Sequence, residues 1–231
     1  MIVAIHQPNF LPWLGFFYKM VRADMFVLLD SVAFAKGSYT NRIKIKSAAG
    51  PAWLTVPVLT SGKLGQPIRE TQCTPTVDWR AKLVRTLETN YGGCPFFGAY
   101  GPDVCQIISS SGDSLAELNI TLVRHMAAKL DIHTPVVRSS ELRAEGKATE
   151  LLIAICKELG AETYLSGSGG ANYQDEQSFA AAGLKLIYAN YRHPTYRQAF
   201  GEFAGGLSIV DLVFNCGGNS PEILRSQQDV Q

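Results

Sequence analysis

Short apolar runs and amphipathic stretches alternate at the start of the chain. Residues 2–6 (IVAIH) and 25–30 (MFVLLD) are apolar runs that end in polar side chains, which is typical of strands buried in a parallel sheet. Between them, residues 11–24 carry apolar side chains at helical spacing, and Pro12 is compatible with a first helical turn. This order of strand, helix and strand predicts a βαβ unit.

The last third of the chain returns to the same alternation. Three apolar segments predict strands, and three amphipathic segments between and after them predict helices. The strands are expected at 134–140, 161–167 and 184–191, and the helices at 147–160, 173–183 and 207–218. Repeated alternation of strand and helix is the pattern of a parallel sheet with helices on both faces.

The middle of the chain has a different pattern. Residues 34–62 alternate basic and apolar side chains and contain turn-forming glycines, which predicts antiparallel ribbons. Helices are predicted at 79–93, with Asp78 as the N-cap, and at 114–130, whereas 94–105 is typical of a turn-rich link.

These patterns predict one α/β domain over residues 1–231. Its expected architecture is a Rossmann-like, doubly wound parallel sheet with a β/α subdomain inserted at about 34–105. A chain of 231 residues with 46% hydrophobic content is large enough to bury one sizeable core.

Charge and cysteine content narrow the class of protein. Lys and Arg (21) nearly balance Asp and Glu (20), so no overall field would attract duplex nucleic acid or anionic lipid. No stretch reaches the roughly 20 apolar residues that a membrane span needs. The five cysteines are scattered without C-x-x-C spacing, which argues against a disulfide framework or a zinc site and favours a reducing, cytoplasmic compartment. No metal site is predicted and no cofactor is identified, while a catalytic thiol stays open at Cys94 or Cys216.

Polar side chains follow each predicted strand of the sheet. In open parallel sheets, ligands bind in the crevice beyond the carboxyl ends of the strands, so these residues are the candidates for a site. We expect the catalytic groups to be His6 and His193, each as a general base. His6 is also compatible with a donor to a phosphate, and both residues are compatible with a histidine satisfied within its own loop. The predicted substrate-binding residues at strand ends and their loops are Gln7, Asn9, Asp30, Ser166, Gly167, Tyr173, Arg192 and Tyr196.

Two further segments point to an anionic ligand. The glycine-rich stretch 166–173 between a strand and a helix suits a phosphate or carboxylate through its backbone N–H groups, or else forms a simple turn. On the predicted ribbon, Asn41, Arg42, Lys44 and Lys46 either contact an anion beside the crevice or form part of a solvated basic face.

The sequence resembles the WbqC-like family of bacterial proteins. The resemblance rests on IHQPNFLPWLGFFYKM, LLDSVAFAKGSYTNRIKIK, WLTVPV, YLSGSGGANY, YRHPTYRQ and LSIVDLVFNCG, which follow one another from residue 5 to about 217. It implies that signature positions of the family are filled here by His6, Gln7, Pro8, Asn9, Asp30, Asn41, Arg42, Ser166, Gly167, Tyr173, His193, Tyr196, Asp211 and Asn215. It also implies a role in surface-polysaccharide or natural-product biosynthesis, in which an amine of an activated sugar or similar metabolite is acylated.

Three functions remain open from the sequence. The first is transfer of an acyl or aminoacyl group to an amine of a nucleotide-linked sugar or related metabolite. The second is ATP-dependent nucleotidyl or adenylyl transfer, although Trp13 and Phe16 stand where the similar loop of nucleotidylyltransferases carries histidines. The third is non-catalytic binding of a metabolite. All three predict a small-molecule partner that is anionic or nucleotide-linked, and all require His6, the Ser166 turn and His193 to meet at one rim of the sheet; the oligomeric state is not predicted.

Overall fold

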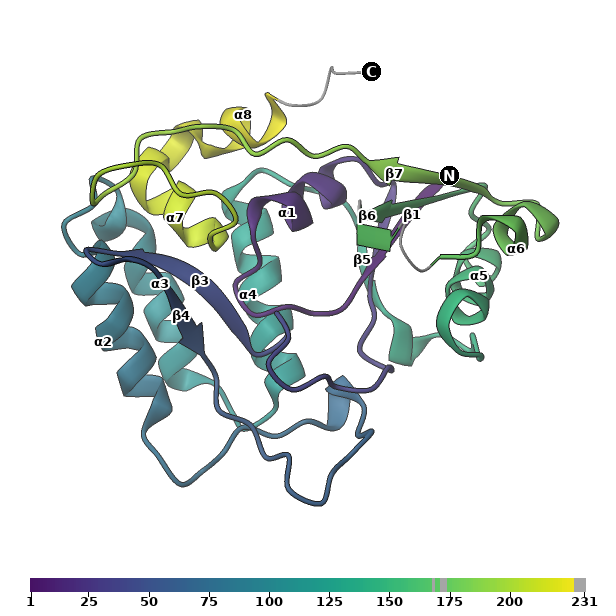
Figure 1. Cartoon of the computed structure of the whole chain (residues 1–231), viewed down its shortest axis with the longest axis horizontal. Helices are drawn as coiled ribbons and strands as arrows, with labels where there is room; N and C mark the ends of the chain where they lie inside the picture. The colour runs from purple at the N-terminus through teal and green to yellow at the C-terminus, as the bar shows by residue number, and fades with distance from the viewer. Residues whose placement is uncertain (168, 171–173, 227–231) are drawn as a thin grey trace.

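The computed structural model describes residues 1–167, 169–170 and 174–226. A parallel sheet of five strands runs through the molecule in the order β5-β2-β1-β6-β7 (Figure 1). Its strands are β1 (Ile2–His6), β2 (Met25–Leu28), β5 (Val136–Arg138), β6 (Thr163–Gly167) and β7 (Lys185–Ala189). The α-helices are α1 (Leu14–Val21), α2 (Trp79–Tyr91), α3 (Phe97–Ser110), α4 (Leu115–Lys129), α5 (Ala148–Glu158), α6 (Glu176–Ala181), α7 (Ile209–Cys216) and α8 (Ser220–Arg225).

The strand order confirms the Rossmann-like α/β fold. The chain moves outward from β1 through β2 to β5, then crosses back to β6 on the other side of β1 and continues to β7. The point between β1 and β6, where the direction of strand addition reverses, is the place at which such sheets leave a crevice for ligands.

Helices cover both faces of the sheet because neighbouring residues of a strand point in opposite directions. Val3 and Ile5 of β1 join one core with α5 and α6, whereas Ala4 joins the other core with α1. Nearly every residue of β1 and β2 is therefore apolar, as the sequence pattern requires for strands buried on two sides.

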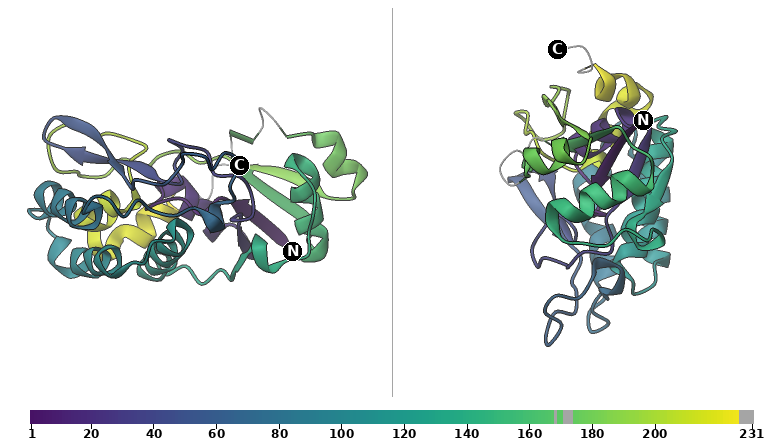
Figure 2. Two further views of the ribbon diagram at one scale, coloured as in Figure 1. Left: turned by 90° about the horizontal axis from the view of Figure 1, so that it is seen from below. Right: turned by 90° about the vertical axis from the view of Figure 1, so that its right-hand side faces the viewer.

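The segment between β2 and β5 forms a separate end of the molecule. It contains the antiparallel ribbon of β3 (Arg42–Ser47) and β4 (Gly50–Thr55), followed by α2, α3 and α4. In the left view of Figure 2, this ribbon and its helices lie at one end of an elongated molecule, and the sheet lies toward the other. Ile43 and Ile45 bury the inner face of the ribbon. The limits of the inserted subdomain stay a prediction.

The turn-rich link predicted for residues 94–105 is wrong, because most of it belongs to α3. Pro102 lies inside this helix, where it removes one backbone donor. Helical spacing nevertheless places Gly101, Val104 and Ile108 on one buried face. A side chain at Gly101 would collide with the ring of Phe97. The glycine therefore lets Phe97 pack against its own helix, and tertiary packing overrides the local turn signals.

One buried carboxylate joins the carboxyl ends of β2 and β5. Asp30, which has no exposed surface, accepts a hydrogen bond from Nε of Arg138 at 2.8 Å. The hydroxyl of Ser139 donates to it at 3.1 Å, and the backbone N–H and hydroxyl of Ser140 donate at 3.0 and 2.9 Å. The same guanidinium reaches the exposed Glu117 at 2.6 Å. Both carboxylate oxygens of Asp30 therefore accept hydrogen bonds from buried or half-buried donors.

We expect Asp30→Asn to lower the free energy of unfolding by about 3 kcal/mol, because it leaves the Arg138 charge without its buried partner. Urea denaturation measures this loss. Glu117→Gln is the matched control: it removes the exposed partner of the same guanidinium and should cost less than about 1 kcal/mol. Equal losses for both variants would contradict the buried pair as the source of stability.

Candidate active site at the switch point of the sheet

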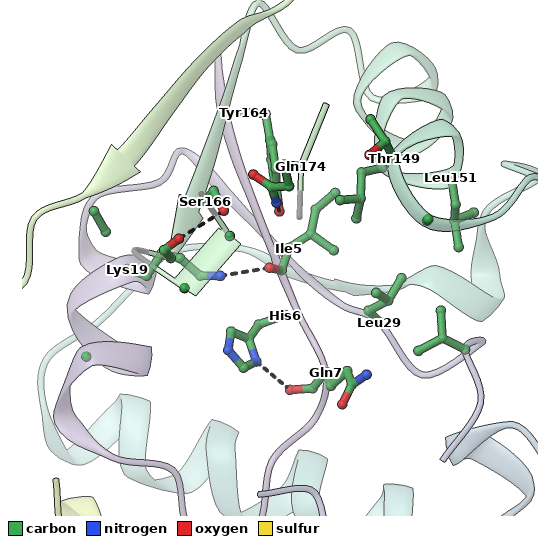
Figure 3. A pocket seen from close by; sticks show the side chains of 18 of the residues that line it. Ile5, His6, Gln7, Lys19, Leu29, Thr149, Leu151, Tyr164, Ser166 and Gln174 are labelled. Atoms are coloured by element: carbon green, nitrogen blue, oxygen red, sulfur yellow. Dashed lines mark hydrogen bonds between the residues drawn. The ribbon is translucent and has the colours of Figure 1, made fainter. Parts of the chain in front are cut away.

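A cavity of about 570 Å³ lies where the carboxyl ends of β1 and β6 meet, within the size range of small-molecule sites. Ile5, Leu29, Val32, Leu151 and Leu152 contribute apolar walls. The polar groups of its described lining are the side chains of His6, Gln7, Lys19, Thr149, Tyr164, Ser166, Gln174 and Tyr191 and the indole of Trp13. Figure 3 labels the first seven of these, which approach the space from both sides of β1.

Lys19 is the cationic side chain of the described lining, and the sequence predictions did not include it. It lies on α1, whose other residues are mostly apolar and buried, and only 3% of it is exposed. Its Nζ donates a hydrogen bond of 2.7 Å to the carbonyl of Ile5 on β1 (Figure 3). A lysine in a short amphipathic helix usually extends its amine to water, which is why its position alone gave no signal.

The amine of Lys19 has no carboxylate partner in the described part of the chain. Burial without an opposite charge disfavours the ammonium form and lowers the pKa of Lys19 from 10.5 to about 7. A large fraction of the amine is therefore neutral near pH 7. Such an amine can take a proton from a bound ligand, whereas an ordinary exposed lysine cannot.

His6 lies at the end of β1 with its ring edge against Trp13 and Phe16, at centroid distances of 5.5 and 5.0 Å. Burial, followed by the charge of Lys19, lowers the pKa of His6 to about 3. The ring is therefore neutral near pH 7. Its Nδ1 lies 3.1 Å from the carbonyl of Gln7, and because a carbonyl only accepts, Nδ1 carries the proton and Nε2 is an acceptor. The free Nε2 can accept an N–H or O–H group of a ligand, the lowered pKa makes the ring a weak base, and the role of His6 as general base stays a prediction.

The Ser-Gly turn also lines the cavity, at the end of β6. Ser166 is 2% exposed, and its hydroxyl donates to the carbonyl of Gly167 at 3.1 Å. A Cβ at Gly170 would lie 2.1 Å from the Ser166 oxygen and 2.9 Å from an oxygen of Gln174. Only glycine allows the turn to approach the strand this closely. The predicted substrate-binding residue Tyr173 lies outside the described residues.

The loop from β1 to α1 forms another wall and is tied to distant parts of the chain. Gln7 lines the cavity and accepts a hydrogen bond from Thr40, whereas Asn9 is buried behind it. Leu11 adopts a φ of 40°, which is costly for a residue with a side chain. Its carbonyl accepts a hydrogen bond from the Ser208 hydroxyl at 2.8 Å.

His193 does not belong to the described lining. Its ring lies 5.8 Å from that of Tyr191, which does line the cavity, and stacks on Tyr196 at 6.2 Å. Its Nδ1 donates to the carbonyl of Pro194. The hydroxyl of Tyr196 in turn donates to the buried Asp211 at 2.8 Å. The structure thus brings His6 and Ser166 to one cavity. His193 contacts Tyr191, which lines this cavity, but is not itself part of the described lining.

The other predicted ligand contacts also lie outside this cavity. Asp30 is buried among its own partners, so its geometry favours positioning of the β2 and β5 ends over contact with a ligand. Arg192 is exposed on the loop after β7. The amide nitrogen of Asn41 donates to the carbonyl of Val56. Arg42 and Lys44 lie on the outer face of the ribbon, over the ring of Trp53.

Comparison with known proteins places the sequence in a family. The family model described as the WbqC-like protein family matches residues 7–223, nearly the whole chain. The chain belongs to the WbqC-like protein family. It is also 33% identical over 225 residues to a protein of Mycobacterium tuberculosis (strain ATCC 25618 / H37Rv) named Uncharacterized protein Rv1507c, covering 96% of this chain and 97% of that one. No solved structure matches significantly.

Burial keeps both candidate cysteines of this WbqC-like protein in the protonated form. Burial raises the pKa of the Cys94 thiol to about 11 and also raises that of Cys216, so both thiols stay protonated. No group of three His, Cys, Asp or Glu side chains within residues 1–167, 169–170 and 174–226 is arranged to hold a metal ion. No helix of these residues combines the length and apolar character that crossing a membrane requires.

The buried amine makes stability depend on pH. The folded chain releases the Lys19 proton at about pH 7, whereas the unfolded chain keeps it up to about pH 10.5, so the unfolded state binds more protons between these values. The free energy of unfolding should therefore gain about 1.5 kcal/mol from this group between pH 7 and pH 8.5. Urea denaturation at both pH values measures the gain.

Lys19→Met should lack this gain, and Lys82→Met, which alters an exposed lysine of α2, should keep it. The comparison between these two variants isolates Lys19 from other titrating groups. An identical pH slope in Lys19→Met and Lys82→Met would contradict a lowered pKa at Lys19.

Proposed function

We propose that this WbqC-like protein is a cytoplasmic enzyme that transfers an acyl or aminoacyl group to an amine of a nucleotide-linked sugar or related metabolite. The reaction belongs to surface-polysaccharide or natural-product biosynthesis. The observation that carries the proposal is the buried amine of Lys19, with a pKa of about 7, in a cavity at the switch point of the sheet. Acylation of an amine releases a proton from the reacting nitrogen, and a base whose pKa lies near the working pH accepts it efficiently.

The step is a nucleophilic substitution at the carbonyl of an activated donor. The acceptor nitrogen forms a bond to the carbonyl carbon, and the bond from that carbon to the leaving group breaks. One proton moves from the attacking nitrogen to the neutral amine of Lys19 and then to the departing group, which restores Lys19. The Nε2 atom of His6, an acceptor, orients an N–H of the incoming amine before attack.

Charge in the cavity supports this reaction over nucleotidyl transfer. The described lining includes Lys19 but no Asp or Glu, and carboxylates are the groups by which proteins usually hold the magnesium of nucleotidyl-transfer sites. Trp13 and Phe16 pack their rings against His6 in the loop where nucleotidylyltransferases place phosphate-binding histidines. The hydroxyl of Ser166 donates its proton to the carbonyl of Gly167, so its oxygen is left to accept an N–H or O–H of the ligand.

Mass spectrometry of nucleotide-linked amino sugars, incubated with acyl-thioester and aminoacyl donors, tests the reaction. We expect a product that gains the mass of the acyl group. Lys19→Met should lower the rate at least about 100-fold, because it removes the proton acceptor. The wild-type kcat/KM should rise with pH through about 7, where Lys19 becomes neutral.

Lys82→Met serves again as the exposed-lysine control and should keep the wild-type rate. Lys19→Arg should be as slow as Lys19→Met, because a guanidinium does not lose its proton in this pH range. Release of pyrophosphate that needs magnesium and a second substrate would replace the proposal with nucleotidyl transfer. If the protein binds a ligand saturably without converting it, and Lys19→Met binds that ligand equally well, the protein would be a non-catalytic binding protein instead of a transferase.

A further inference from the structure

A line of aromatic rings leads from the cavity to the outer face of the ribbon. Trp13 lies 5.5 Å from His6 and lines the cavity, and its ring is 5.3 Å from that of Tyr39. Tyr39 lies 6.0 Å from Trp53 on β4. We call Trp13, Tyr39, Trp53, Arg42 and Lys44 the aromatic–cation strip.

The outer part of this strip is exposed although it is apolar. Tyr39 is 43% exposed and Trp53 is 45% exposed. Large aromatic side chains that touch each other and face water are a common mark of a binding surface. Their contact with Trp13 makes this surface continuous with the cavity.

Two cations lie over the same aromatic surface. The guanidinium of Arg42 is 4.2 Å from the centre of the Trp53 ring, and the amine of Lys44 is 5.4 Å from it. Neither side chain has a carboxylate within ion-pair distance in the described part of the chain, and the buried Nε of Arg42 has no hydrogen-bond partner there. The strip therefore carries positive charge that nothing in these residues neutralises.

We propose that the aromatic–cation strip binds the nucleoside diphosphate of the substrate. A planar base stacks on the exposed ring of Trp53 with its edge against Tyr39, whose plane is tilted by 50° from that ring, and the phosphates meet Arg42 and Lys44. An uncharged sugar ring alone would make no use of two unpaired cations, whereas a nucleotide uses both the rings and the charge. This rests on the proposed function, since it places the nucleotide outside the cavity and the reacting amine near Lys19.

Gly15 holds the inner end of the strip in place. A Cβ at this position would lie 2.7 Å from the indole nitrogen of Trp13 and 3.0 Å from the ring of Tyr191. The indole of Trp13 lies across the first turn of α1 only because Gly15 has no side chain. Gly15 thus leaves room for the Trp13 indole, which connects the cavity to Tyr39 and the ribbon.

Titration calorimetry with uridine, thymidine, guanosine and adenosine diphosphates tests the strip without requiring turnover. At least one of them should bind saturably and more tightly than inorganic pyrophosphate. Trp53→Ala should weaken that binding about tenfold or more, and Trp53→Phe should retain most of it, because a phenyl ring still stacks. Arg42→Gln should weaken binding and reduce its dependence on salt.

Phe96→Leu and Arg85→Gln are matched controls, an exposed aromatic and an exposed arginine away from the strip, and should bind as the wild type does. Far-ultraviolet circular dichroism and thermal unfolding verify that each variant is folded. Unchanged affinity in folded Trp53→Ala, or no saturable binding of any nucleotide, would overturn the proposal.

Different results would contradict nucleotide binding by the aromatic–cation strip and the proposed acyl transfer. Lys19→Met should bind the nucleoside diphosphate normally, because Lys19 lies inside the cavity. If Lys19→Met binds the nucleoside diphosphate as the wild type does and Trp53→Ala does not, the result supports nucleotide binding by the aromatic–cation strip. This holds even if no transfer product forms with any donor. Conversely, transfer that depends on Lys19 but keeps its KM in Trp53→Ala overturns the strip and leaves the proposed function intact.

Discussion

The amine of Lys19 is held in the cavity by the carbonyl of Ile5 and by no carboxylate in the described part of the chain. A buried ammonium is costly without an opposite charge, so the fold accepts a lysine that is easily deprotonated. The same contact fixes α1 against β1, because donor and acceptor lie on consecutive elements. One hydrogen bond thus both adds to the packing of α1 on β1 and positions the amine in the cavity.

Unlike the amine of Lys19, the buried carboxylates of Asp30 and Asp211 are surrounded by hydrogen-bond donors. Asp30 is fully buried but surrounded by donors from Arg138, Ser139 and Ser140. Asp211 is also fully buried; burial raises its pKa, while hydroxyl groups of two tyrosines and the amide of Gln198 stabilise its charged form. Both acids therefore serve the structure at a distance from the cavity lining. The negative charges of Asp30 and Asp211 are satisfied by donors within the fold, and the described lining of the cavity carries the amine of Lys19 without an acidic side chain.

Much of the fold follows from local patterns, but the site follows only in part. The strands were predictable because two-sided burial demands continuous apolar runs. Their polar ends include His6, Gln7 and Ser166, which line the cavity, while the roles of these residues stay predictions. Lys19 was not predictable, since its pKa depends on which groups fold around it. His193 depends likewise on distant packing, because Tyr196 and Asp211 hold its loop behind the wall. Helix α3 contains two glycines and a proline, which are local turn signals in the sequence. The packing of its buried face, which stabilises the helix, depends on distant parts of the chain.

The hydrogen bond from Ser208 to Leu11 joins the first loop of the chain to a residue near its other end. During synthesis, β1 and α1 leave the ribosome long before Ser208 does. The left-handed conformation of Leu11 is costly, and the hydrogen bonds from Ser208 to Leu11 and from Ile209 to Pro12 are among the contacts that offset this cost. The wall of the cavity is consequently completed late, so a nascent or truncated chain would contain the lysine and the histidine without the enclosed space that gives them their properties.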